Sequence, residues 1–180
     1  MKASIFVGVS VDGFIARSND SFDFLSAGGG ETEPHGFTEF LATVDALVMG
    51  RRTFDVVLGL SPWPYGEKPV FVLSNRPVPP GPEGTIVERM SGTPEEILAE
   101  LESRGVHHVY VDGGATIQAF LRAGRIQHLT ISRVPVLIGS GISLFGELTA
   151  DILLRHVGTR TFPSGLVQSE YAIDTPAAGR

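Results

Sequence analysis

The sequence contains no cysteine among its 180 residues, and this absence excludes several kinds of chemistry. Disulfide bonds, thiolate metal sites and cysteine nucleophiles all require that side chain. The five histidines lack the spacing of a zinc site, so we expect no bound metal. The sequence also lacks a Ser-His-Asp pattern and a nucleophile elbow. Any catalytic chemistry must therefore use other residue types.

Positive charge is also scarce, with 14 lysines and arginines against 20 acidic residues and a net charge of −6. This balance argues against a nucleic-acid or membrane partner, because both surfaces attract cationic proteins. No apolar run approaches the ~20 residues that span a bilayer, and the N-terminus lacks the regions of a signal peptide. We expect a cytoplasmic protein that acts on a small molecule.

The composition is typical of a globular chain, with 42% hydrophobic and 19% charged residues. One domain usually takes about 100–200 residues. We therefore predict a single domain over residues 1–174 and a frayed tail over residues 175–180.

Segments typical of strands and of helices alternate along the chain. The clearest helix boundary is a predicted capping box, with Thr93 as N-cap, Pro94 at the first helical position and Glu96 at the third. The alternation predicts an α/β fold with a mostly parallel central sheet, flanking helices and a C-terminal antiparallel strand pair. The predicted strands cover residues 4–11, 46–49, 70–73, 85–87, 109–111 and 126–138, with an interruption at Pro135 in the last of these and the final pair within 153–173. The predicted helices cover residues 37–44 and 52–58, a segment after Thr93 and one after Gly114, and the polar residues 18–36 are predicted to form a loop.

Three predicted strands end in segments that suit a phosphate-bearing ligand. The first is Gly50-Arg51-Arg52-Thr53, where glycine permits close approach and two arginines open a helix. The second is Ser74-Asn75-Arg76, beyond the strand end where open α/β sheets bind ligands. The third is Gly113-Gly114-Ala115-Thr116, between a strand and a helix. Each also has a plain structural interpretation, as a solvated helix start, a surface turn and a tight turn, and the third does not match GxGxxG.

The order of these segments along the chain is more specific than any one of them. In this order the chain resembles the dihydrofolate reductase-like superfamily, and most of all the reductase domain of the bifunctional riboflavin-biosynthesis deaminase-reductase and its stand-alone relatives. The resemblance spans residues 4 to about 173. It is carried by residues 10–16, 23–25, 49–54, 73–76, 113–115 and 135–141, together with Phe145.

The resemblance implies a dihydrofolate reductase-like fold, a homodimer and NADPH as cofactor. By this resemblance the cofactor phosphates would contact Gly50, Arg51, Arg52 and Thr53, and the pyrophosphate Gly113, Gly114, Ala115 and Thr116. The adenosine ribose and its 2′-phosphate would lie near Ser74, Asn75 and Arg76, and the nicotinamide near Val7, Gly8, Ile15 and Ala16. Because strand ends in a parallel sheet share one edge, we expect Arg51 and Arg76 to converge and to favour NADPH over NADH.

The resemblance is weaker on the substrate side. Dihydrofolate reductases carry a carboxylate on the first helix, and the corresponding stretch here offers Glu33 and Glu39. Glu39 borders an apolar helix face and is our candidate proton donor, although a solvated helix glutamate is the alternative. We expect hydride transfer from NADPH to a small, heterocyclic substrate. The alternatives are a pyrimidine reductase of riboflavin biosynthesis and an NADPH-binding protein without turnover.

Overall fold

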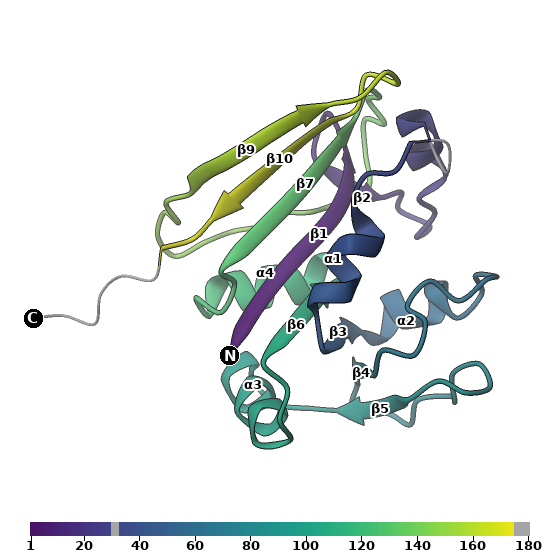
Figure 1. Cartoon of the computed structure of the whole chain (residues 1–180), viewed down its shortest axis with the longest axis vertical. Helices are drawn as coiled ribbons and strands as arrows, with labels where there is room; N and C mark the ends of the chain where they lie inside the picture. Colours follow the sequence, from purple (N-terminus) through teal and green to yellow (C-terminus); the bar gives the residue numbers. More distant parts are fainter. Residues whose placement is uncertain (30–32, 175–180) are drawn as a thin grey trace, which may run out of the picture.

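The computed structural model, which describes residues 1–29 and 33–174, contains an eight-stranded sheet with the order β5-β4-β3-β6-β1-β7-β10-β9 (Figure 1). The predicted tail at 175–180 lies outside the described residues. In chain order the strands are β1 (Lys2–Ser10), β3 (Ala46–Gly50), β4 (Val70–Leu73), β5 (Val87–Met90), β6 (His108–Asp112), β7 (His128–Val134), β9 (Arg155–Thr161) and β10 (Val167–Ala172).

Most of this sheet is parallel, as the sequence predicts. Strand β1 pairs in parallel with both β6 and β7, and β3 pairs in parallel with β4 and β6. Strands β9 and β10 form the predicted antiparallel pair at one edge, with β10 antiparallel to β7. A second, two-stranded sheet joins β2 (Phe14–Ala16) to β8 (Ile142–Ser143) and was not predicted.

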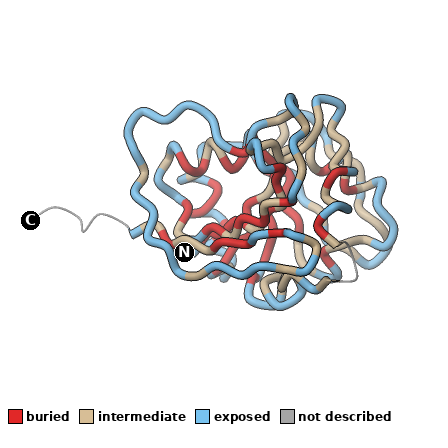
Figure 2. The backbone as a smooth tube through the Cα atoms, turned by 90° about the horizontal axis from the view of Figure 1, so that it is seen from above, coloured by how far each residue is buried: buried red, intermediate tan, exposed pale blue. Residues whose placement is uncertain are grey.

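Helices cover both faces of the sheet. On one face, α3 (Pro94–Ser103) and α4 (Gly114–Arg122) bury Leu101 and Phe120 in a core that also contains Ile5 of β1. On the other face, α2 (Arg51–Val57) packs against β3 and β4 with Phe54 fully buried, and α1 (Phe37–Thr43) packs through Phe40 against Phe6 of β1 and Tyr110 of β6. Figure 2 shows the buried residues gathered in the centre of the molecule. Burial of this apolar surface is the main stabilising term of such a fold.

The predicted capping box at the start of α3 is confirmed. The Thr93 hydroxyl accepts the Glu96 backbone N–H at 3.3 Å, and the Glu96 carboxylate accepts the Thr93 N–H at 2.8 Å. Both donors belong to the group that a helix start leaves without intrahelical partners.

Several predicted element bounds differ from the structure. Strand β7 covers only part of the predicted segment 126–138: it begins at His128 and ends at Val134, directly before Pro135, which has no N–H for the sheet. Strand β5 begins at Val87 rather than at residue 85. Within the predicted loop, Asp23–Gly28 form a 3-10 helix, η1, that packs Phe24 into the interior. In the described part of the chain, no helix has the length and apolar character needed to cross a membrane.

Candidate functional site

A cavity of about 470 Å³ opens beside the carboxyl ends of β3 and β6. The strand register brings these ends together, since Met49 of β3 pairs with Asp112 of β6. The end of β4 lies beside them, because Gly50 pairs with Leu73. This is the edge of an open α/β sheet where ligands bind. The volume lies within the usual range of small-molecule sites, about 300–1,000 Å³.

The first turn of α4 forms one wall of the cavity. Its N-cap, Gly113, has φ 91°, and no side chain caps the helix. Gly114, Ala115 and Thr116 all line the cavity. A helix start without a side-chain cap offers backbone N–H groups and a partial positive charge to an anion.

Packing within the protein also requires glycine at this turn. A Cβ at Gly113 would lie 2.2 Å from Thr53 Oγ1, and one at Gly114 would lie 3.1 Å from the carbonyl oxygen of Ser143. The tight-turn interpretation therefore accounts for part of the glycine requirement. A larger side chain at Gly114 would disturb β8 as well as any ligand at the helix start.

Arg52 of α2 provides a positive charge at the cavity. Its Nε lies 2.5 Å from Asp20 Oδ1, and its Nη2 donates to the Ser18 carbonyl at 3.2 Å. Arg52 and Asp20 both line the cavity, and the Arg52 side chain is 64% exposed. The guanidinium is therefore open to solvent and can reach an anion placed at the start of α4 or α2.

Asp112, the last residue of β6, provides a carboxylate deeper in the cavity. Its Oδ1 accepts the Gly113 N–H at 2.8 Å, and its Oδ2 accepts the Tyr65 hydroxyl at 3.1 Å. Burial raises the pKa of Asp112 above its usual value, and these hydrogen bonds oppose the rise only in part. A carboxyl group with a raised pKa inside a cavity is suited to hold and release a proton.

Aromatic side chains surround Asp112. Burial also raises the pKa of Tyr65 and of Tyr110 well above the usual value, so both phenols stay protonated. The Tyr110 hydroxyl donates to the Phe6 carbonyl at 2.9 Å. Phe6, Phe22 and both tyrosines line the cavity. Such walls suit a flat ring, with Asp112 as the acidic group beside it.

The structure gathers most of the predicted cofactor residues around this one cavity. They come from β1, from β2 and from the starts of α2 and α4. The predicted residues that line it are Val7, Gly8, Ile15, Ala16, Gly50, Arg52, Thr53, Gly113, Gly114, Ala115 and Thr116. Their contact with a cofactor remains a prediction.

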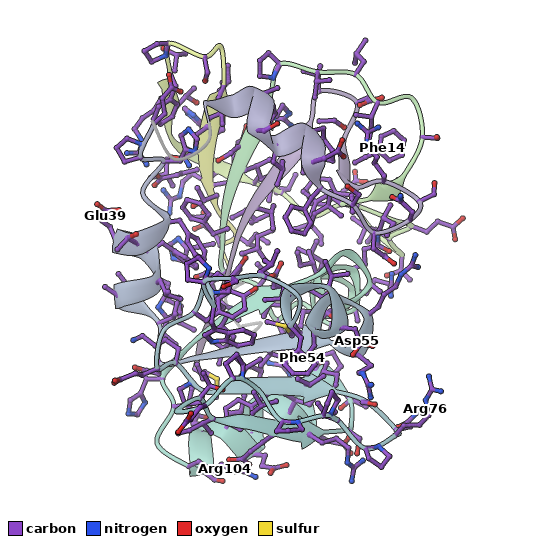
Figure 3. The ribbon with its side chains drawn as sticks, turned by 90° about the vertical axis from the view of Figure 1, so that its right-hand side faces the viewer. Phe14, Glu39, Phe54, Asp55, Arg76 and Arg104 are labelled. Carbon is purple, nitrogen blue, oxygen red and sulfur yellow. The ribbon has the colours of Figure 1, made fainter. Side chains whose placement is uncertain are left out.

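The other predicted cofactor residues lie at the same sheet edge but outside the cavity lining. The Ser74 hydroxyl closes a turn by donating to the Arg76 carbonyl at 2.8 Å, and Asn75 and Arg76 are exposed. Arg51 donates to the Pro77 carbonyl at 2.6 Å and to Asp55 at 2.7 Å. Arg51 therefore contacts the loop that carries Arg76, while Arg76 itself extends away from the sheet (Figure 3), and the convergence of the two side chains on a ligand stays a prediction.

Glu39, the predicted proton donor, does not lie at the cavity. It is exposed on the outer side of α1, as Figure 3 shows, and it is not part of the cavity lining. Glu33 is bound elsewhere, with its carboxylate accepting the Ser164 backbone N–H at 2.9 Å and hydroxyl at 2.6 Å. The apolar side of α1 next to Glu39 packs on the core, where the neighbouring Phe40 contacts Phe6 and Tyr110.

The sequence analysis missed Asp112 and Tyr65. Asp112 stands at the carboxyl end of an apolar strand, directly before the two glycines, and this position alone could have indicated it. Tyr65 carries no comparable signal, because it lies in an irregular loop between α2 and β4, 47 residues from Asp112 in the chain.

Three comparisons relate this geometry to known proteins. The chain is 33% identical over 163 residues to the uncharacterized protein YwjB of Bacillus subtilis (strain 168), covering 89% of this chain and 92% of that protein. It is 38% identical to a protein of Shewanella sp. PV-4 whose name assigns it to riboflavin biosynthesis, with a TM-score of 0.89 over 97% of this chain and 100% of the other. A dihydrofolate reductase from Enterococcus faecalis, complexed with NADP(H), shares the fold at a TM-score of 0.65 and 18% identity over 97% of each chain.

The family model for the RibD C-terminal domain matches residues 2–168, nearly the whole described chain. That span contains every strand and helix that lines the cavity, as well as Asp112 and the two glycines that follow it. The resemblance predicted from the order of the motifs is confirmed. The chain has a dihydrofolate reductase-like fold and belongs to the RibD C-terminal domain family, the reductase domain of riboflavin biosynthesis.

Proposed function

We propose that this protein is an NADPH-dependent reductase that transfers a hydride to a C=N or C=O group of a small, flat heterocycle. One observation carries the proposal: the glycine turn at α4, the arginine of α2 and the half-buried acid Asp112 line a single cavity. The first two suit a phosphate-bearing cofactor, and the third suits proton transfer to a substrate. Membership of a reductase family supports the same assignment.

The described residues fit a dinucleotide cofactor. The uncapped start of α4 and the Arg52 guanidinium can hold the phosphates. Val7, Gly8 and Ile15 line the part of the cavity formed by β1 and β2, where a nicotinamide ring would lie. The bound cofactor would supply the hydride, and the protein would supply orientation and exclusion of water.

Asp112 is our proposed proton donor, in place of Glu39. Its carboxyl group is held by hydrogen bonds to Gly113 and Tyr65, and its raised pKa keeps a larger protonated fraction than an ordinary aspartic acid. Hydride addition to a C=N or C=O group leaves the heteroatom negative, so a proton must reach that atom. A substrate ring that lies between the aromatic walls would have this heteroatom within reach of Asp112.

A pyrimidine of riboflavin biosynthesis is the substrate that the family match favours. The 38% identical Shewanella protein carries that assignment in its name. We retain this pyrimidine reductase as the second candidate function. It differs from the first only in the identity of the heterocycle.

The experiment is a two-stage assay. Binding of NADPH and NADH is measured by calorimetry, and oxidation of the reduced nicotinamide is then followed with dihydropterins, ribosylamino-pyrimidines and quinones. We expect NADPH binding and turnover of at least one heterocycle, with Asp112→Asn as the matched variant that binds NADPH but turns over slowly. Tight binding without oxidation across this set would instead identify a cofactor-binding protein without turnover. Failure to bind NADPH would remove the proposal altogether.

A further inference from the structure

The loop between α2 and β4 reaches the proposed proton donor through one side chain. Tyr65 belongs to this loop, is 4% exposed and lines the cavity. Its hydroxyl donates to Asp112 Oδ2 at 3.1 Å. This bond connects the irregular loop between α2 and β4 to the carboxyl end of β6.

The two oxygens of Asp112 have separate partners. Oδ1 accepts the Gly113 N–H, and Oδ2 accepts the Tyr65 hydroxyl. One bond to each oxygen fixes the rotation of the carboxyl plane about the Cβ–Cγ bond, because turning the plane would break both. Without the tyrosine hydroxyl, only the Gly113 bond would remain to orient the group.

The position of Tyr65 is itself well fixed. Its ring packs edge-on against Trp63, with centroids 5.3 Å apart, and against Tyr110 at 6.5 Å. Trp63 in turn packs edge-on against the buried Phe54 of α2 at 6.4 Å. A hydroxyl on a buried, closely packed ring loses little further freedom when it holds a partner, so it is an effective positioning group.

We propose that Tyr65 is a positioning residue for the reaction, and that its hydroxyl orients the Asp112 carboxyl group toward the substrate. The inference rests on the proposed function, since it assumes that Asp112 donates the proton. It assigns the irregular loop between α2 and β4 a part in the chemistry. Tyr65 itself transfers nothing: the proton leaves Asp112, and the phenol remains protonated throughout.

The same bond also affects the ionisation of Asp112. A hydroxyl that donates to a carboxylate stabilises the charged form, so the Tyr65 bond lowers the pKa of Asp112 against the larger effect of burial. The other groups near Asp112 are the Gly113 N–H, which acts in the same direction, and the Tyr110 hydroxyl, whose proton is donated to the Phe6 carbonyl. Arg52 and Asp20 line the same cavity as an ion pair with each other.

The test compares Tyr65→Phe with Trp63→Phe. The first removes only the hydroxyl. The second changes the packing of the same loop but keeps an aromatic ring against Tyr65, so we expect the bond from Tyr65 to Asp112 to remain. Thermal unfolding confirms that both variants fold. The pKa of Asp112 is measured by carboxyl NMR titration of the whole protein, which requires no substrate. Turnover is measured against pH with the heterocycle that the wild-type protein reduces fastest.

We expect Tyr65→Phe to raise the pKa of Asp112, to move the alkaline fall in turnover to higher pH and to lower turnover on the acidic plateau about tenfold, a change of ~1.4 kcal/mol. Trp63→Phe should leave both the titration and the alkaline fall in place. An unchanged Asp112 titration in folded Tyr65→Phe overturns the inference, as does an equal shift in Trp63→Phe. If no heterocycle is reduced, the proposed function fails, and the NMR titration still decides whether Tyr65 controls Asp112.

Discussion

Arg52 and Asp20 form an ion pair at the cavity, with 2.5 Å between Arg52 Nε and Asp20 Oδ1. The pair links the start of α2 to the loop that precedes η1. Asp20 has φ 70°, in the left-handed region that residues other than glycine rarely adopt. Among those residues, aspartate and asparagine adopt it most readily. An anion that binds Arg52 must therefore compete with a carboxylate that is already in place.

This competition gives the first prediction. Arg52→Ala should weaken NADPH binding at least tenfold, because a hydrogen bond to a charged group contributes about 1.5–3 kcal/mol. Asp20→Asn should strengthen binding by a few-fold at most, since the pair is partly exposed and screened by solvent. Asparagine tolerates the left-handed backbone, so the loop should keep its shape. Calorimetric titration measures both effects, and weaker binding by Asp20→Asn would contradict the assumed competition.

The second prediction concerns the choice between NADPH and NADH. Arg76→Ala should weaken NADPH binding and leave NADH binding nearly unchanged, because Arg76 is exposed beyond the end of β4 and free to meet a 2′-phosphate. Arg51→Ala should show the same selectivity with a smaller effect, since Asp55 and Pro77 already occupy its guanidinium. Dissociation constants for both cofactors provide the measurement. Equal affinity of the wild-type protein for NADPH and NADH would refute the assignment.

The third prediction separates the roles of Asp112 in activity and stability. Asp112→Asn should reduce turnover by about 10²–10⁴, the usual contribution of a general acid, and leave NADPH affinity unchanged. In the wild-type protein, turnover should fall as pH rises through the raised pKa of Asp112, because only the protonated form donates. The folded state holds this proton more tightly than the unfolded state, so stability also falls as pH rises through that pKa.

Replacing the acid with a neutral amide removes this cost of charge burial. At neutral pH, Asp112→Asn should therefore unfold at the same temperature as the wild-type protein or higher. A combined measurement of turnover, NADPH affinity and thermal unfolding checks the three expectations. A variant that loses stability and activity together would assign Asp112 a structural role instead.

Physical reasons explain which parts of the site were predictable. Glycines and arginines directly after apolar strands have to lie at one edge of a parallel sheet, so Gly50, Arg52 and Gly113 could be assigned from their positions. Glu39 was chosen because apolar residues surround it in the sequence. That pattern indicates which side of α1 is packed, but it does not indicate which residues line the cavity at the sheet edge. The packed side of α1 contacts aromatic rings of the core, and Glu39 is exposed.

The fold was predictable for the same reason, and its errors have local causes. Alternating strand and helix signals identified the parallel sheet, and the interruption predicted at Pro135 is where β7 ends. The short pair of β2 and β8 joins Phe14 to Ser143, and no local sequence pattern predicts a contact between residues so far apart in the chain. The bond between Tyr65 and Asp112 belongs to this class, because it depends on the path of an irregular loop.

The fourth prediction concerns stability below neutral pH. His108 is buried, with Nε2 2.8 Å from Ser4 Oγ and Nδ1 2.8 Å from the Thr43 carbonyl oxygen. Burial lowers the pKa of His108 below its usual 6.5. The unfolded chain therefore takes up the proton first, so the stability is fully present above pH 6.5 and is lost as pH falls toward the folded pKa.

Urea unfolding between about pH 7 and pH 5 tests this dependence. We expect His108→Asn to reduce the slope of unfolding free energy against pH. The His108 variant should also be less stable at neutral pH, because its two buried hydrogen bonds are altered. A slope that His108→Asn does not change would show that another group titrates in this range.

The position of β1 between β6 and β7 has a consequence for the order of synthesis. Strand β1 is synthesised before β6 and β7, and it pairs, through Ser4, with Tyr110 on one side and His128 on the other. At about 5–20 residues per second, β1 must wait several seconds for both neighbours. During that time its two edges are open, and pairings between distant segments are slow to form. Until β6 and β7 have both been synthesised, β1 lacks its two neighbours, and it is in this interval that we expect aggregation to compete with folding.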